Sequence, residues 1–93
     1  MQIECVFFGP FREAVGEKTV QFETDAETVG ELLSDLETAY PALDGRLVAA
    51  DGGGLAGETV VTRDRKNVTH LDGLETIVET DSVIRLVPSV YGG

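Results

Sequence analysis

The feature that most restricts the fold is one apolar helical stripe in the first half of the chain. Five residues recur at positions i, i+3, i+4, i+7 and i+11, along one side of a helix: Val29, Leu32, Leu33, Leu36 and Tyr40. Thr28 and Glu31 have the spacing of a capping box at the start of this helix, and Pro41 ends it. In a chain of 93 residues, only a sheet built from the remaining segments can cover this stripe.

Alternating apolar and polar residues predict the strands of that sheet. The expected strands are residues 1–8, 18–24, 58–63, 67–71 and 82–89, and residues 47–51 are a candidate for a further short strand. A short helical turn or loop closed by Gly16 separates the first two strands, which we expect to pair as a hairpin. A turn around Asp64-Arg65 joins the next two. The helical crossover favours parallel pairing of the first and last strands.

These elements predict an α+β roll: a mixed sheet of four to five strands with one main helix packed on one face. The length is that of a single domain. We expect the folded domain to comprise residues 1–88 and residues 89–93 to form a flexible tail.

Charge and cysteine content restrict the partners and the compartment. The chain carries 17 acidic and 7 basic residues, a formal net charge of −10, which disfavours nucleic acid and anionic membrane surfaces as partners. Dispersed acids with only two lysines are typical of a salt-adapted cytoplasm, and the alternative is an ordinary acidic protein. A single cysteine, no secretory signal and no long apolar run predict a cytoplasmic location.

The domain itself offers few residues for chemistry. Cys5 is the only cysteine and His70 the only histidine, so no metal site with the usual number of ligands can be assembled. Cys5 is in register with Ile3 and Phe7, which predicts a thiol of the hydrophobic core. His70 is expected near a strand end, in a turn-stabilising or exposed role. The glycines of residues 51–57 lack the Lys-Ser/Thr of a phosphate-binding loop. We therefore expect neither a catalytic residue nor a bound metal.

The last segment, LVPSVYGG (residues 86–93), is the remaining candidate. Pro88 stiffens the exit from the last strand, and the five residues beyond it can extend over about 17 Å. Two terminal glycines make the slimmest backbone, so the tail can enter a narrow channel and present its carboxylate to a buried site on another protein. The alternative interpretation is a disordered end.

Four segments in order carry a resemblance to a known family: FFGPFREAVG, TVGELLSDLETAYPAL, NVTHLDGLET and LVPSVYGG. Over nearly its whole length the chain resembles the ubiquitin-like β-grasp sulfur carriers, which include the small subunit of molybdopterin synthase and the small archaeal modifier proteins. The resemblance implies that a ubiquitin-activating-type enzyme, using ATP and magnesium, adenylates the carboxylate of Gly93. The acyl group then passes on as a thiocarboxylate, for molybdopterin or tRNA thiolation, or forms an isopeptide bond with a lysine of a target protein. The chain would be a reactant with no bound cofactor, rather than an enzyme.

The resemblance also implies a role for particular residues. Gly93 is the activated residue and Gly92 the slim spacer. An apolar patch on the open sheet face would dock the activating enzyme, and its candidates are Phe8, Val87, Val90 and Tyr91. For Phe8 and Val87, ordinary half-buried packing is an equal alternative.

Two positions depart from the family pattern. Asp64-Arg65 stands where relatives often have Asn-Gly, which leaves the turn type open. Tyr91 is bulky for a threading tail, which favours a modifier or a broadly used carrier over a dedicated molybdopterin synthase subunit.

Alternatives to the carrier remain. The chain could be a non-covalent β-grasp interaction module with an incidental Gly-Gly end, the small subunit of molybdopterin synthase, or a tag that modifies itself at Lys18 or Lys66. The sequence leaves sulfur transfer and protein tagging equally open. The expected partners are an adenylating enzyme and either target lysines or a sulfur-accepting enzyme such as the molybdopterin synthase large subunit, and we expect a monomer when the protein is alone.

Overall fold

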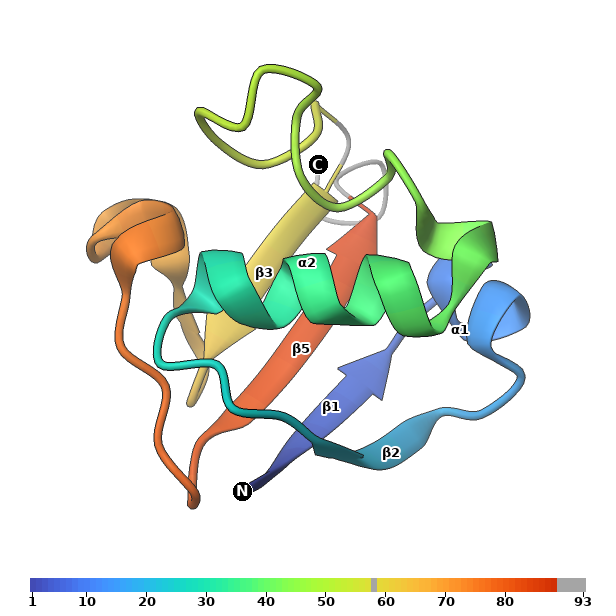
Figure 1. Ribbon diagram of the computed structural model, residues 1–93, viewed down its shortest axis with the longest axis horizontal. Helices are drawn as coiled ribbons and strands as arrows, with labels where there is room; N and C mark the ends of the chain where they lie inside the picture. Colours follow the sequence, from blue (N-terminus) through green and yellow to red (C-terminus); the bar gives the residue numbers. More distant parts are fainter. Residues whose placement is uncertain (58, 89–93) are drawn as a thin grey trace.

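The computed structural model describes residues 1–57 and 59–88, which form one five-stranded mixed sheet with a helix packed across it (Figure 1). The strands are β1 (Gln2–Phe7), β2 (Thr19–Glu23), β3 (Thr59–Arg63), β4 (Lys66–Asn67) and β5 (Val83–Pro88). Their order in the sheet is β2-β1-β5-β3-β4. β1 pairs antiparallel with β2 and parallel with β5, as expected, and β5 pairs antiparallel with β3. The predicted α+β roll is confirmed.

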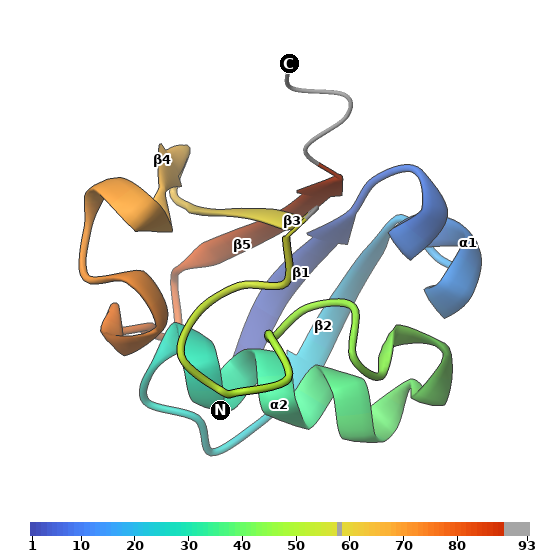
Figure 2. The same ribbon diagram turned by 90° about the horizontal axis from the view of Figure 1, so that it is seen from above.

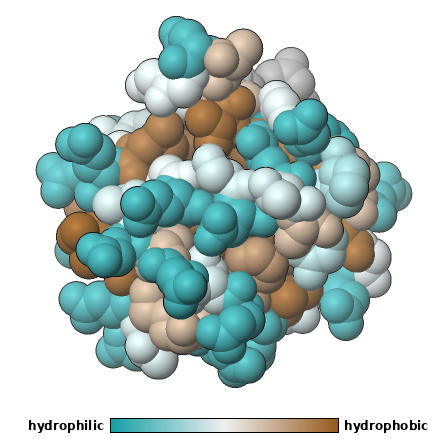
Figure 3. Space-filling view, viewed as in Figure 1, coloured by the Kyte–Doolittle hydropathy of each residue, from teal (hydrophilic) through white to brown (hydrophobic). Residues whose placement is uncertain are grey.

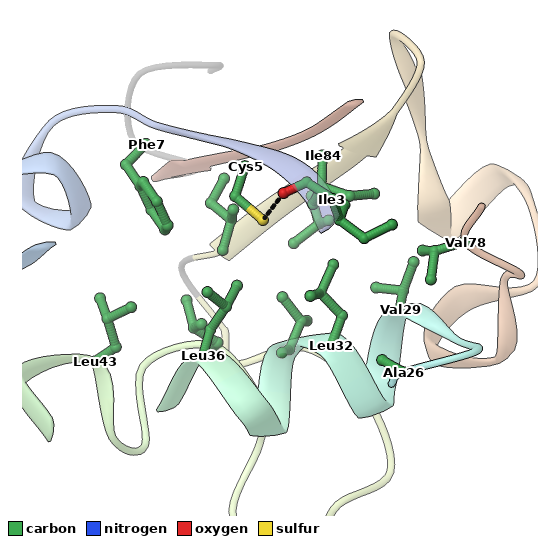
Figure 4. Close-up of a cluster of buried hydrophobic side chains, with 14 of the residues drawn as sticks. Ile3, Cys5, Phe7, Ala26, Val29, Leu32, Leu36, Leu43, Val78 and Ile84 are labelled. Atoms are coloured by element: carbon green, nitrogen blue, oxygen red, sulfur yellow. Dashed lines mark hydrogen bonds between the residues drawn. The ribbon is translucent and has the colours of Figure 1, made fainter. Parts of the chain in front are cut away.

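The main helix, α2 (Val29–Ala39), lies across one face of the sheet, and its apolar stripe forms the centre of the core (Figures 2 and 4). Val29, Leu32, Leu33 and Leu36 are fully buried, opposite the inward side chains of β1 and β5. Each such side chain contributes about 1.5–3 kcal/mol by leaving water. Tyr40 is half-buried, with its ring centroid 6.4 Å from that of Phe7 and 6.3 Å from that of Phe22. The prediction of this helix and of its buried face is confirmed.

The start of α2 is capped as the sequence indicated, with one difference. The hydroxyl of Thr28 accepts a hydrogen bond from the Glu31 N–H (3.2 Å), which is one half of the capping box. The carboxylate of Glu31 accepts from the N–H of Glu27 (2.8 Å), one residue before the cap. Within the helix, Gly30 lies against Leu74: a Cβ at position 30 would be 3.1 Å from the Leu74 Cβ, so a side chain there would crowd this contact.

A short helix, α1 (Pro10–Val15), separates β1 from β2. Pro10 occupies the first turn, where no intrahelical N–H is needed, and Gly16 ends the helix in a left-handed conformation at φ 90°. Its buried residue, Phe11, joins the core. The predicted helical turn closed by Gly16 is confirmed.

The turn between β3 and β4 uses Asp64 and Arg65 at φ 52° and 74°. Positive φ at both central residues is the requirement of a type I′ hairpin turn, which Asn-Gly usually meets. Asp64 is tied to the start of β5 by two hydrogen bonds: its N–H donates to the Val83 carbonyl (3.0 Å), and its carboxylate accepts from the Val83 N–H (2.9 Å).

The strand expected at residues 67–71 is wrong in part. Residues 67–71 extend β4 only as far as Asn67, after which a 3₁₀ helix, Val68–His70, begins. The Asn67 side chain accepts from both the N–H and the hydroxyl of Thr69, which turns the chain out of the ladder. His70 accordingly ends a 3₁₀ helix rather than a strand.

Residues 47–51 form no strand; a single bridge joins Val48 to Leu55. The N–H groups of Leu47 and Val48 donate instead to one carboxylate oxygen of Glu37, at 3.0 and 3.1 Å. Further 3₁₀ turns, Pro41–Leu43 and Gly73–Glu75, complete the described part of the chain. Seen from the α2 side, most of the surface is hydrophilic, in keeping with the net charge of −10 (Figure 3).

Candidate functional site

The candidate site begins where β5 leaves the sheet. β5 is the central strand, with β1 on one side and β3 on the other, so its backbone is fixed by ladders on both edges. Ile84 and Leu86 are fully buried beneath it, and Pro88, also buried, ends the strand opposite Thr59. The chain beyond Pro88 therefore starts from a rigid point. Gly92, Gly93, Val90 and Tyr91 lie outside the described residues.

The open face of the sheet, opposite α2, carries a small apolar patch beside this point. The register places Val60 directly opposite Val87, and the Phe8 N–H donates to the Leu86 carbonyl (3.1 Å), which brings Phe8 alongside β5. Val6 lies one position further along the same face of β1. We call this set the exit patch: Val6, Phe8, Val60 and Val87.

The backbone of Phe8 lies beside β5, and Phe8 and Val87 are both half-buried, which ordinary packing predicts equally well. The sequence interpretation missed Val60 and Val6. Val60 could have been found from the strand alternation, because its neighbour Val61 faces the core and is fully buried. Val6 was assigned to the correct face, yet it is only 7% exposed. The docking role of the patch stays a prediction.

Charged side chains border the exit patch, one in the row of Val6 and one in the next row of the sheet. Arg85 lies between Val6 and Thr62 in register, on the central strand. Glu4 lies beside Val83 and accepts a hydrogen bond from the Gln21 amide (3.3 Å). The patch is therefore bordered by the positive charge of Arg85 and, one row further on, by the negative charge of Glu4. A docking partner with complementary charges can recognise this pattern.

Both lysines are exposed. Lys18 precedes β2, and its carbonyl accepts from the Phe7 N–H (2.7 Å), while Lys66 begins the edge strand β4. Exposure suits a solvated lysine as well as an isopeptide acceptor, so the acceptor role also stays a prediction.

The side chain of Cys5 faces the core, as predicted. Its thiol is fully buried and lies 3.7 Å from the Ile3 carbonyl oxygen. Burial, with a smaller contribution from the charge of Glu4, raises the pKa of the Cys5 thiol to about 12. The thiol is neutral at physiological pH and is not a nucleophile. Within residues 1–57 and 59–88, no three His, Cys, Asp or Glu side chains come together as a metal site.

Comparison with known proteins identifies the family. The ThiS family model matches residues 5–93, which includes the Gly-Gly end. The chain belongs to the ThiS family. It is 36% identical to small archaeal modifier protein 3 of Haloferax volcanii over 94 residues, covering 100% of both chains.

Solved structures agree with this assignment of the chain to the ThiS family. SAMP1 from Haloferax volcanii has a TM-score of 0.80 at 30% identity, with 100% of each chain covered. A chain of the Amycolatopsis orientalis BexX/CysO complex has a TM-score of 0.80 at 27% identity, over 98% of this chain and 99% of that one. The fold is the ubiquitin-like β-grasp, and the relatives are small modifier and carrier proteins, two of them from a halophilic archaeon.

No helix in the described part of this ThiS-family chain is both long and apolar enough to cross a bilayer.

Proposed function

We propose that this protein is a covalent carrier or modifier whose reacting group is the carboxylate of Gly93. The observation that carries the proposal is the position of β5: the central, doubly paired strand leads directly to the Gly-Gly end and emerges beside the exit patch. The match to the ThiS family through residue 93 and the likeness to small archaeal modifier proteins support it.

The proposed chemistry occurs on a partner enzyme. A carboxylate is a poor electrophile, so an adenylating enzyme joins it to the α-phosphate of ATP, releasing pyrophosphate and forming a mixed anhydride. Attack by hydrosulfide on the carbonyl carbon then expels AMP and leaves a thiocarboxylate. Attack by a lysine amine expels AMP with loss of a proton and leaves an isopeptide bond. This chain supplies the carbonyl group, the slim approach through Gly92, and the surface that the enzyme recognises.

The direct test is intact-mass analysis of the protein after incubation with its host's activating enzyme, ATP and Mg²⁺, with and without a sulfur source. We expect a mass increase for the acyl-adenylate and a replacement of oxygen by sulfur when the sulfur source is present. A chain with one residue appended after Gly93 is the matched control and is expected to stay unmodified. An unchanged mass of the native chain under all conditions contradicts the proposal.

Protein tagging leaves a defined peptide. The nearest tryptic site before the tail is Arg85, so a modified lysine would carry the eight residues LVPSVYGG rather than a bare Gly-Gly. We expect mass spectrometry of host proteins to find this branch on target lysines if tagging occurs. Its absence, together with a detectable thiocarboxylate, would restrict the function to sulfur transfer.

The exit patch provides a second test. Val60→Asp places a charge in the patch beside Val87, on a half-buried position of the open face, and leaves the core side of β3 unchanged. We expect activation of Gly93 to slow at least tenfold while the fold persists, because desolvating an unpaired carboxylate opposes docking. Gln2→Asp, on the same face but at the exposed start of β1 and four residues before Val6, is the control and is expected to react normally.

The runner-up is a non-covalent β-grasp interaction module. It predicts that removing Gly92 and Gly93 leaves partner capture and cell phenotype unchanged, whereas the carrier loses its covalent products and the phenotype. A dedicated molybdopterin synthase subunit is a narrower form of the carrier, and the bulk of Tyr91 disfavours it.

A further inference from the structure

A second surface borders the end of β5, on the α2 side of the sheet rather than on the open face. A groove of about 320 Å³ lies between α1, the loop of residues 45–57 and the ends of β3 and β5. Figure 1 shows the tip of β5 directed between α1 and this loop. The lining residues that matter here are Pro10, Phe11, Arg46, Ala56, Thr59 and Pro88. The size is at the lower end of the range of small-ligand pockets, about 300–1,000 Å³.

Arg46 is the one charged residue among the described lining residues of this groove. Its guanidinium carbon lies 5.4 Å from the centroid of the Phe11 ring, and Phe11 is itself only 3% exposed. The ring holds the cation at the groove by a cation–π contact. Among residues 1–57 and 59–88, no carboxylate lies within ion-pair distance of Arg46. The groove therefore combines apolar walls with a cation suited to a carboxylate.

The path from the end of β5 to Arg46 is short. Thr59 is opposite Pro88 in the β3–β5 ladder, where facing Cα atoms are about 4.5–5.5 Å apart. The Thr59 hydroxyl donates a hydrogen bond to the Arg46 carbonyl oxygen. Five residues beyond Pro88 can reach about 17 Å, so a carboxylate at position 93 can be placed within the groove that Pro88 and Arg46 both line.

We propose that residues 89–93 of this chain dock into this groove in the resting protein, with the Gly93 carboxylate paired to the Arg46 guanidinium. Val90 and Tyr91 supply apolar side chains for the walls formed by Pro10 and Ala56. Docking withholds the carboxylate from a partner until the tail is released. The proposal rests on the proposed function in one respect: Gly93 carries the free terminal carboxylate.

The docked state is in equilibrium with a free tail. A surface ion pair favours one state by at most about fivefold, and salt screens it. Arg46→Gln is therefore expected to speed activation of Gly93 about two- to fivefold in low salt, since a larger fraction of the tails is free. The difference in activation rate between Arg46→Gln and the native protein should become smaller in 1 M salt.

The test uses the isolated protein in solution and needs no enzyme. Backbone and side-chain NMR spectra are compared between the full chain, a chain ending at Pro88, and full-length Arg46→Gln. We expect truncation to shift the signals of Phe11, Ala56 and Gly57, and Arg46→Gln to move the Gly93 amide signal of the full chain. Arg12→Gln is the matched control, because Arg12 lies next to Phe11 on α1 but lines a separate hollow with Gly9 and Glu13.

Identical groove signals in the full and truncated chains would overturn the proposal. An equal response of the Gly93 signal to Arg46→Gln and Arg12→Gln would overturn the ion pair. Groove signals that move only when the activating enzyme is added would assign the groove to the partner and overturn the tail as occupant. A docked tail with no change of mass in the enzymatic assay would instead refute the proposed function and leave the docking intact.

Discussion

Cys5 occupies a position of β1 that faces the core, where the alternation of the strand requires an apolar side chain. The residues packed around the thiol determine its ionisation. Cys5 lies in the core cluster with Ile3 and Phe7, all fully buried, so the sulfur behaves as a small apolar group (Figure 4). Removal from water disfavours the thiolate, which accounts for the raised pKa. The burial of Cys5 could be predicted from the sequence because side chains two residues apart in a strand lie on the same face, and Ile3 and Phe7 are apolar.

The buried thiol makes the stability of the protein depend on pH in the alkaline range. The pKa of Cys5 rises from 9.0 to about 12 on folding, so above pH 9 the unfolded chain releases a proton that the folded chain keeps. The free energy of unfolding therefore falls as pH rises above 9, by about 1.4 kcal/mol per unit from this group. Urea unfolding between pH 8 and 10.5 measures this slope. Cys5→Ala should lack it, and equal slopes for the two proteins would show that the thiol is not protected.

At the scale of elements, a single carboxylate positions a whole loop. Glu37, near the end of α2, accepts hydrogen bonds from the N–H groups of Leu47 and Val48, and Leu47 is fully buried as a result of this placement. This anchor connects the main helix to the loop that carries Arg46, and so to one wall of the groove beside Pro88.

Removing the Glu37 anchor should cost stability. Glu37→Ala leaves two partly buried N–H groups without an acceptor, and we expect a loss of about 1–3 kcal/mol in the free energy of unfolding, measured by urea denaturation. Glu37→Gln keeps one acceptor oxygen and should lose less. Glu17→Gln, at an exposed position, is the control and is expected to stay within about 0.5 kcal/mol of the native protein. If Glu37→Ala also stayed within about 0.5 kcal/mol of the native protein, the loop would keep its conformation without the Glu37 hydrogen bonds.

Elements with a long periodic pattern were predictable, and those decided by one side chain were not. The stripe of α2 and the alternation of β1 and β5 each involve several residues that agree. After Asn67, by contrast, two β-branched residues favour a strand, but the asparagine side chain captures the Thr69 N–H and turns the chain. Residues 47–48 fail as a strand because Glu37, ten residues earlier, takes their N–H groups.

The candidate site was predictable in part for the same reason. Alternation placed Phe8 and Val87 on the open face, but the partner of Val87 across the sheet depends on the β3–β5 register, which no local pattern specifies. The outward face of Val60 follows from alternation, but its place beside Val87 does not. The groove at Arg46 was not foreseen either, because it forms where α1, a loop and two strand ends meet.

The whole molecule is a strongly acidic body with few cations to offset the charge. Its formal net charge is −10, and the ion pairs formed within the described residues involve only Met1 with Glu23 and Arg63 with Asp64. Such an excess opposes compaction at low ionic strength, where the repulsion extends over about 10 Å at 0.1 M salt.

Salt should therefore stabilise the protein. We expect the free energy of unfolding, measured by urea denaturation, to rise steadily between 0.1 and 2 M KCl as screening shortens the repulsion to about 3 Å. A variant with Glu17→Lys and Asp81→Lys, both at exposed positions, is less acidic and should respond less steeply. A flat or falling dependence in the native protein would remove the support for salt adaptation and favour an ordinary acidic protein.

The exit patch is assembled from three strands whose residues stand far apart in the sequence, at positions 6, 8, 60 and 87. The exit patch forms only when β5, the last strand of the chain, is paired with both β1 and β3. An enzyme that must bind this patch before it consumes ATP therefore acts only on chains whose sheet is complete. A misfolded or incomplete chain has the Gly-Gly end but lacks the binding surface. Under the proposed docking, activation of Gly93 is thus restricted to folded molecules.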